Sequence, residues 1–149
     1  MSEVGDGVDP GSLVQTYCER WAARDKLGCL GLMSSDVVWA LYVPQEVLPF
    51  GGETRGVASI SDRLQMVLDQ FDTLNYRGFV TRTQGNIVSG QVAYRFRHKI
   101  TGEDIEGVMR VVATIENGSI ARWDEYHDVE KVKAFMRLIA YTASDPSMG

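Results

Sequence analysis

Three stretches of the chain repeat apolar residues every three to four positions, a pattern typical of helices with one buried face. The first runs from about residue 11 to residue 33, and Lys26-Leu27-Gly28 breaks it to leave a short second helix. Two more helices are predicted near residues 60–71 and 129–141, and Asp128 is well placed to cap the last. The apolar stripe of the first helix consists of Leu13, Val14, Tyr17, Cys18 and Trp21.

Five further stretches are rich in β-branched and aromatic residues and end in turn signals, so they predict strands. The first, residues 36–43, ends at Pro44, and the proline- and glycine-rich residues 44–56 predict a loop. Asn117-Gly118 is a strong hairpin signal, because both positions of the tight primed turns need φ > 0. An antiparallel meander is predicted for the other four strands, residues 74–83, 86–100, 104–116 and 119–128.

This order of elements predicts an α+β fold, because consecutive strands without crossover helices cannot form a parallel α/β sheet. We expect a cone-shaped, curved antiparallel sheet that wraps around the long N-terminal helix. The open end of such a cone leaves a cavity lined by inward-facing side chains, and pockets of this shape commonly bind small molecules.

Glu125 is the best functional clue, because this carboxylate lies among aromatic residues near the end of the last strand. Side chains alternate along a strand, so Trp123, Glu125 and His127 share one face. A carboxyl group in an apolar pocket can serve as a general acid or base near neutral pH. We interpret His127 as a structural or rim residue, because it stands beside the predicted helix cap. The alternative for Glu125 is an ion pair across the sheet with Arg95, Arg97 or Arg110.

Length, composition and charge limit the classes of protein to which this chain can belong. A chain of 149 residues fits one domain, and its net charge of −5 with scattered basic residues argues against a nucleic-acid binder. The N-terminal segment is acidic and glycine-rich, and no apolar run approaches the roughly 20 residues of a membrane span, so we expect a cytoplasmic protein without a membrane partner. The chain has two cysteines, Cys18 and Cys29, and we expect both to be buried free thiols. Alternation splits the acidic and histidine residues 124–128 between two faces, so neither a metal site nor a cofactor is expected.

Several segments together resemble the nuclear transport factor 2-like superfamily, and more narrowly the SnoaL-like polyketide cyclases, ketosteroid isomerases and limonene epoxide hydrolases. These are helix-borne Tyr17, PFGGETRGVASI (49–60), TGEDIEGVM (101–109) and above all NGSIARWDEYHD (117–128). The resemblance implies a disordered tail over residues 1–10, a single SnoaL-like domain over 11–141 and a C-terminal tail over 142–149. It also implies a deep apolar cavity and a homodimer, and outward-facing Val108, Val112 and Thr114 suit a dimer surface.

The resemblance implies roles for individual residues. Glu125 occupies the position of a cavity carboxylate that acts as acid or base in the hydrolases and cyclases, and Tyr17 matches a tyrosine that donates to an oxyanion in the isomerases. The pattern also departs from these relatives. Leu41 replaces a polar residue on the first strand, and apolar or aromatic residues near Val92, Tyr94 and Phe96 replace the hydrolases' other charged groups.

Three functions therefore remain open. The first is a small cofactor-independent enzyme of the isomerase, cyclase or epoxide hydrolase type, with Glu125 and Tyr17 as catalytic residues. The second is a non-catalytic protein that binds a hydrophobic ligand, and the third is a protein-interaction module. We expect the apolar ligand or substrate to contact Trp39, Leu41, Tyr94, Met109 and Trp123.

Overall fold

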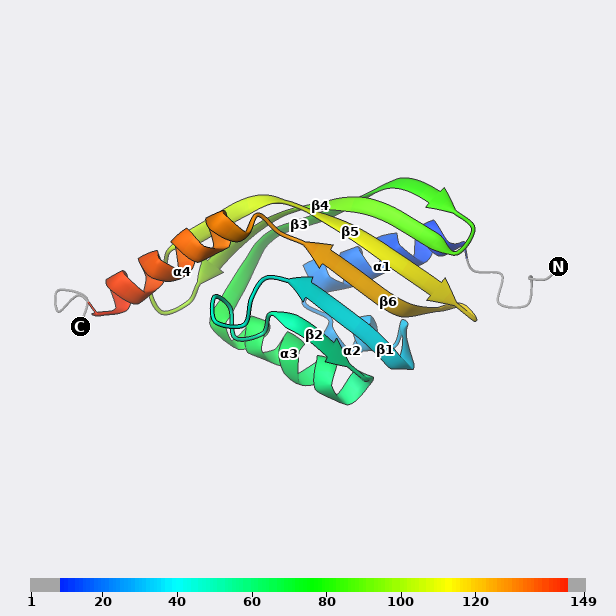
Figure 1. Cartoon of the computed structure of the whole chain (residues 1–149), viewed down its shortest axis with the longest axis horizontal. Coiled ribbons are helices and arrows are strands. Elements are labelled where there is room, and N and C mark those ends of the chain that lie inside the picture. The colour runs from blue at the N-terminus through cyan, green and yellow to red at the C-terminus, as the bar shows by residue number, and fades with distance from the viewer. Residues whose placement is uncertain (1–8, 145–149) are drawn as a thin grey trace.

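The computed structural model describes residues 9–144, which form four helices and six strands. Figure 1 shows a curved, unclosed sheet with α1 behind its strands and α4 extending from one end. The α+β class predicted from the sequence is confirmed. In chain order the elements are α1 (Pro10–Ala22), α2 (Lys26–Leu30), β1 (Met33–Tyr42), β2 (Gly52–Arg55), α3 (Val57–Gln70), β3 (Phe71–Gln84), β4 (Ile87–His98), β5 (Asp104–Glu116), β6 (Ser119–Tyr126) and α4 (Val129–Ser144).

The six strands lie in the order β2-β1-β6-β5-β4-β3. The predicted meander from β3 to β6 is confirmed, with antiparallel pairing at each step. β1 joins the meander parallel to β6, so that Trp39 lies opposite Trp123 and Leu41 opposite Glu125. This pairing brings the first strand of the chain next to the strand that carries the candidate carboxylate.

Strand β2 corrects the prediction of a loop over residues 44–56. Its four residues pair antiparallel with β1, and Thr54 lies opposite Trp39. Four residues with two charges and a glycine are too short to show the alternation that marks a strand in a sequence. β3 also begins earlier than predicted, at Phe71, immediately after α3 ends at Gln70.

Both terminal helices extend beyond the expected domain limits. The carboxylate of Asp9 accepts a hydrogen bond of 2.9 Å from Ser12 N, and Pro10 takes the first helical position, so α1 begins inside the segment expected to be a tail. α4 continues to Ser144, and Asp128 accepts from Lys131 N near its start, as predicted. The remainder of both expected tails lies outside the described residues.

Turns and irregular pairing give the sheet its curvature. Asn117 and Gly118 have φ values of 51° and 75°, so the predicted primed turn between β5 and β6 is confirmed. The register shifts within the β1–β6, β3–β4 and β5–β6 pairs, and such irregularities increase strand bending and twist.

The main core fills the concave side of the sheet. Leu13, Val14, Tyr17 and Trp21 of α1 are buried there with Ile60 and Leu64 of α3 and the inward residues of the strands. Cys18 and Cys29 are buried free thiols, as predicted. Within residues 9–144, the structure contains no helix with the length and apolar character needed to span a membrane.

Candidate functional site

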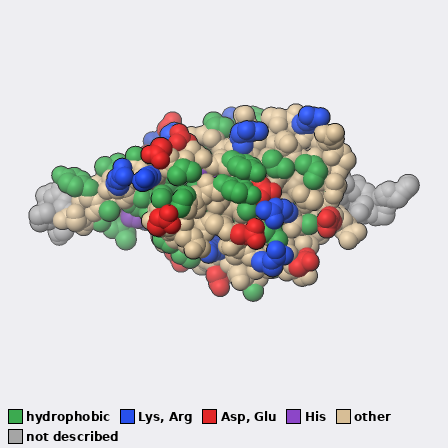
Figure 2. All heavy atoms as spheres, viewed as in Figure 1, with side chains coloured by type: hydrophobic (Ala, Val, Ile, Leu, Met, Phe, Trp, Pro, Cys, Tyr) green, Lys and Arg blue, Asp and Glu red, His purple; other side chains and the backbone are tan. Residues whose placement is uncertain are grey.

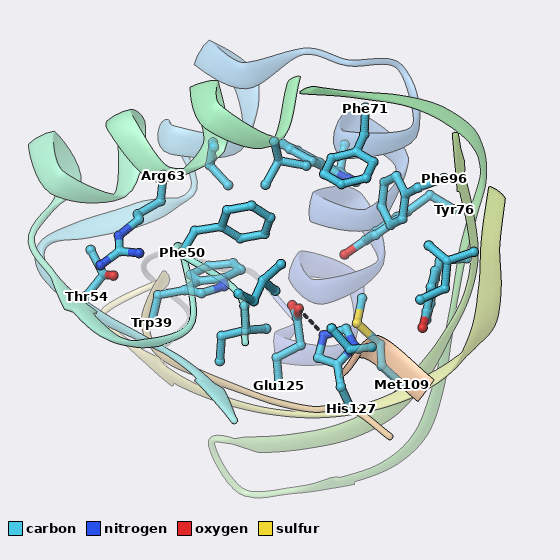
Figure 3. A pocket seen from close by; sticks show the side chains of 18 of the residues that line it. Trp39, Phe50, Thr54, Arg63, Phe71, Tyr76, Phe96, Met109, Glu125 and His127 are labelled. Atoms are coloured by element: carbon cyan, nitrogen blue, oxygen red, sulfur yellow. Dashed lines mark hydrogen bonds and ion pairs between the residues drawn. The ribbon is translucent and has the colours of Figure 1, made fainter. Parts of the chain in front are cut away.

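A largely apolar pocket of about 140 Å³ opens between the concave face of the sheet and helices α3 and α4. Helix α1 contributes Tyr17 and Trp21 to its lining, and α4 contributes Val132, Phe135 and Met136. Figure 3 shows Glu125 and His127 joined by a hydrogen bond, with Trp39, Phe50 and Tyr76 around the same space. The pocket therefore encloses a carboxylate in predominantly hydrocarbon surroundings.

Both carboxylate oxygens of Glu125 are held by neighbours on its own strand face. Oε1 accepts a hydrogen bond of 3.0 Å from Nε1 of Trp123, and Oε2 lies 2.7 Å from Nε2 of His127. The side chains of Glu125 and His127 are each 13% exposed. A carboxylate offers about four acceptor positions, so two such hydrogen bonds fix its orientation and leave positions free for a proton or a water.

Trp123, which donates to this carboxylate, packs against two other aromatic rings. The rings of Trp39 and Trp123 stack at a centroid distance of 4.8 Å, and Tyr17 packs 4.7 Å from Trp123 and 5.2 Å from Trp39. Trp123 is completely buried and does not line the pocket, whereas Tyr17 and Trp39 do. The structure therefore places Trp123 behind the pocket wall, where its indole N–H reaches Glu125.

Three buried tyrosines, Tyr17, Tyr76 and Tyr94, also line the pocket. Burial raises the pKa of Tyr17 and of Tyr76 well above the usual value, and the charge of Glu125 contributes to both shifts. Both therefore keep their protons at neutral pH and remain donors, and Figure 3 shows Tyr76 directed into the pocket. Tyr94 has a pKa raised to about 12, mainly by burial. Its hydroxyl lies by Gly107, where an added Cβ would approach it to 3.0 Å.

A second polar region of the pocket contains Arg63 of α3 and Thr54 of β2. Nη1 of Arg63 donates a hydrogen bond of 2.7 Å to the carbonyl oxygen of Pro49. Among residues 9–144, Arg63 forms no ion pair with a carboxylate. In Figure 3 the Arg63 and Thr54 side chains lie at one side of the pocket, apart from Glu125.

The structure brings most of the predicted site residues to this pocket. Its lining contains six of the seven, namely Glu125, Tyr17, Trp39, Leu41, Tyr94 and Met109, while Trp123 lies behind it. The alternative of an ion pair between Glu125 and an arginine is wrong for the described residues. Arg95 and Arg97 instead bind Asp104 on the outer face, each at 2.7 Å, because odd-numbered residues of β4 point away from the pocket.

Sequence reasoning missed several lining residues. His127 contacts Glu125 directly and lines the pocket, so its interpretation as a structural or rim residue understates its position. Arg63 also carried a signal, because it falls within the apolar stripe of Ile60, Leu64 and Val67 at helical spacing. Phe50 and Tyr76 carried no such signal in the sequence. Phe50 lies in a loop and Tyr76 in the long strand β3, and both reach the pocket only through the tertiary fold.

No family model matches the chain, and no curated protein matches it by sequence. Solved structures do share its fold. A candidate isomerase from Rhodopseudomonas palustris aligns with a TM-score of 0.74 and 16% identity, covering 89% of this chain and 98% of that one. A candidate polyketide cyclase from Xanthomonas campestris pv. campestris aligns with a TM-score of 0.70 and 19% identity, covering 85% and 96%.

A third similar structure is a nuclear transport factor 2-like protein of unknown function from Burkholderia pseudomallei. Its TM-score is 0.72 at 18% identity, with 89% of this chain and 98% of that one covered. The predicted resemblance in fold to the nuclear transport factor 2-like and SnoaL-like proteins is thereby confirmed.

Proposed function

From this nuclear transport factor 2-like fold, we propose that the protein is a small cofactor-independent enzyme that transforms an apolar small molecule by general acid/base catalysis at Glu125. The observation that carries the proposal is a carboxylate in an apolar pocket with both oxygens held by hydrogen bonds. Fold alone does not define a reaction, so the argument rests on these side chains.

The geometry supports proton transfer at Glu125. Trp123 and His127 orient the carboxylate, and its free acceptor positions take a proton from a carbon next to a carbonyl or from a water. Tyr17 and Tyr76 donate hydrogen bonds to the oxygen on which negative charge develops. Aromatic walls exclude bulk water, which strengthens these interactions. Isomerisation of an enone, cyclisation of a polyketide and opening of an epoxide all use this chemistry.

Turnover of a panel of cyclic epoxides and β,γ-enones, measured by product analysis, tests the proposal. Glu125→Gln keeps the shape of the side chain and removes the ionisable group, so we expect kcat/KM to fall by about 100-fold or more. Glu116→Gln is the matched control, because Glu116 is exposed at the end of β5. Equal turnover by Glu125→Gln and the wild type would refute a catalytic role for Glu125.

A non-catalytic binding protein is the second candidate. The observation in its favour is that Leu41, Tyr94 and Phe96, which line the pocket, stand where the resembled hydrolases carry polar partners of the carboxylate. In this case Glu125 serves to orient a ligand through a hydrogen bond. This function would be favoured if the protein binds an apolar compound without converting it, and if Glu125→Gln changes only the affinity for that compound.

We further propose a homodimer formed through the outer face of the sheet. Figure 2 shows hydrophobic side chains gathered over the middle of this face, with acidic and basic side chains around them. Tyr42 and Tyr126 stack there at 4.5 Å and are 44% and 43% exposed, and Val108 is 59% exposed. Exposed apolar clusters of this kind mark interaction surfaces.

A further inference from the structure

Arg63 is the only positively charged Lys or Arg side chain among the described residues that line the pocket. It lies in the buried stripe of α3 between Ile60 and Leu64, both of which are buried. Arg63 itself is only partly buried and its hydrogen bond to Pro49 is exposed, so its guanidinium keeps contact with water and is accessible to an anion that enters the pocket. Its carbonyl partner at Pro49 satisfies one N–H and leaves the positive charge without a counterion within residues 9–144.

The bond to Pro49 also orients the guanidinium. One Nη1–H of the group donates a hydrogen bond of 2.7 Å, which holds the side chain at the pocket, and no other hydrogen bond from its guanidinium is formed within residues 9–144. Thr54 lines the same part of the pocket, and its side chain is a second hydrogen-bond donor there. A planar fork of N–H donors beside a hydroxyl matches the geometry of a carboxylate.

The two charged regions of the pocket have opposite sign. Glu125 lies with His127 at the β6 side, and Arg63 lies with Thr54 at the side formed by α3 and β2 (Figure 3). Between them the lining is aromatic and aliphatic, with Trp39, Phe50 and Leu64. An anionic group on a ligand is repelled by Glu125 and attracted by Arg63, so the charges give a bound molecule one favoured orientation.

We propose that Arg63 and Thr54 form an anion subsite, and that the ligand of this pocket is an amphiphilic carboxylic acid with an aromatic or alicyclic body. Its carboxylate binds Arg63 and its body fills the apolar lining. The reacting end then lies at Glu125. This inference narrows the apolar molecule of the proposed function to one that also carries an anionic end. It rests on the proposed function for the last step only, since anion binding at Arg63 does not need Glu125 to be catalytic.

Paired probes test the subsite. Isothermal titration calorimetry compares 2-naphthoate with 2-naphthamide, which has the same shape and no charge. We expect the wild type to bind the carboxylate about 10-fold or more tightly than the amide, because charge-assisted hydrogen bonds contribute more than neutral ones. Arg63→Gln should abolish this preference, and Arg63→Lys should keep part of it.

Two control variants distinguish an effect on anion binding from an effect on the loop at Pro49, which Arg63 contacts through its hydrogen bond. Thr54→Val leaves the Arg63–Pro49 hydrogen bond in place and should weaken naphthoate binding by about 2- to 10-fold, and naphthamide binding by less, because the hydrogen bond from Thr54 to the neutral amide is the weaker one. Arg137→Gln makes the same charge change at an exposed position on α4 and should leave the preference intact. Equal binding of both probes by the wild type, binding of neither, or an unchanged preference in Arg63→Gln would overturn the inference.

Glu125→Gln distinguishes this inference from the proposed function. It removes a negative charge from the pocket, so 2-naphthoate should bind it at least as tightly as the wild type. A preserved preference for naphthoate together with unimpaired turnover in this variant would refute catalysis at Glu125 and leave the anion subsite standing. If Arg63→Gln loses the preference for naphthoate and Glu125→Gln keeps it, the anion subsite is supported whether or not Glu125→Gln retains turnover.

Discussion

At the scale of single residues, the hydrogen bond between His127 and Glu125 orients the carboxylate on which the proposed catalysis depends. The two side chains lie on one face of the β6 end at a separation of two residues, and their polar atoms are 2.7 Å apart. His127 also packs edge-on against Tyr94 at 5.9 Å, which holds the imidazole in place. We therefore regard His127 as a positioning residue for Glu125.

Substitution of His127 tests this positioning role. His127→Phe keeps a flat ring and removes the hydrogen bond to Glu125, so kcat/KM should fall by about 10- to 100-fold, the value of one hydrogen bond to a charged group. His127→Gln supplies an amide donor and should recover part of the activity. The pH profile of kcat/KM should change in His127→Phe, and an unchanged profile and rate would contradict the role.

The two cysteines give a prediction that does not depend on catalysis. Burial raises the pKa of the Cys18 and Cys29 thiols to about 12, so both thiols stay protonated in the folded protein at pH 8. The native protein should therefore react slowly with 5,5′-dithiobis(2-nitrobenzoate), and the urea-unfolded protein rapidly. Because both folded pKa values are raised, their stabilisation is present below about pH 9 and is lost as the pH rises toward 12. Immediate labelling of the native thiols would contradict this.

At the scale of elements, the β5–β6 hairpin sets the position of Glu125. Its turn requires positive φ at Gly118, where φ is 75°, and a side chain in this conformation costs about 1–2 kcal/mol. Gly118→Ala should lower the free energy of unfolding by about that amount in urea denaturation. Gly31→Ala is the control, because Gly31 has φ of −64° and only ordinary contacts, and it should not destabilise the fold. Equal effects of both substitutions would contradict the explanation.

The outer face of the β4–β5 pair carries an ion-pair cluster with a defined pH response. Hydrogen bonds from Arg97 and Arg95 lower the pKa of Asp104 to about 2. Because the folded pKa is depressed, the stabilisation is present above the unfolded value near pH 4 and is lost as the pH falls toward 2. Asp104→Asn should be less stable than the wild type at pH 7, and the two should converge near pH 2. If the difference in stability between Asp104→Asn and the wild type stays constant from pH 7 to pH 2, the ion pairs are not its cause.

At the scale of the whole molecule, the proposed dimer predicts a mass in solution of twice 16.6 kDa by light scattering. Val108→Glu places a charge in the exposed apolar cluster of the outer face and should give the monomer mass. Leu27→Glu is the matched control, because Leu27 is 78% exposed on α2, away from the sheet. A wild-type protein of 16.6 kDa would refute the dimer.

The pocket is also a property of the whole molecule. Its walls come from α1, α3, α4 and the strands β1 to β6, and its two charged side chains, Arg63 and Glu125, lie 62 positions apart in the sequence (125 − 63). Local periodicity indicated which face of β6 carries Glu125 and placed Arg63 in the apolar stripe of α3, but it could not show that the two side chains share one pocket.

The sequence alone determined the α+β class, the meander, the Asn117-Gly118 turn and the shared face of Trp123, Glu125 and His127. These features depend on local rules, since a strand alternates with a period of two and a helix repeats near 3.6 residues. The tertiary structure alone decided the parallel pairing of β1 with β6, the short strand β2 and the placement of Phe50 and Tyr76 in the pocket. Those features arise where segments distant in the chain pack together, and no local period records such a contact.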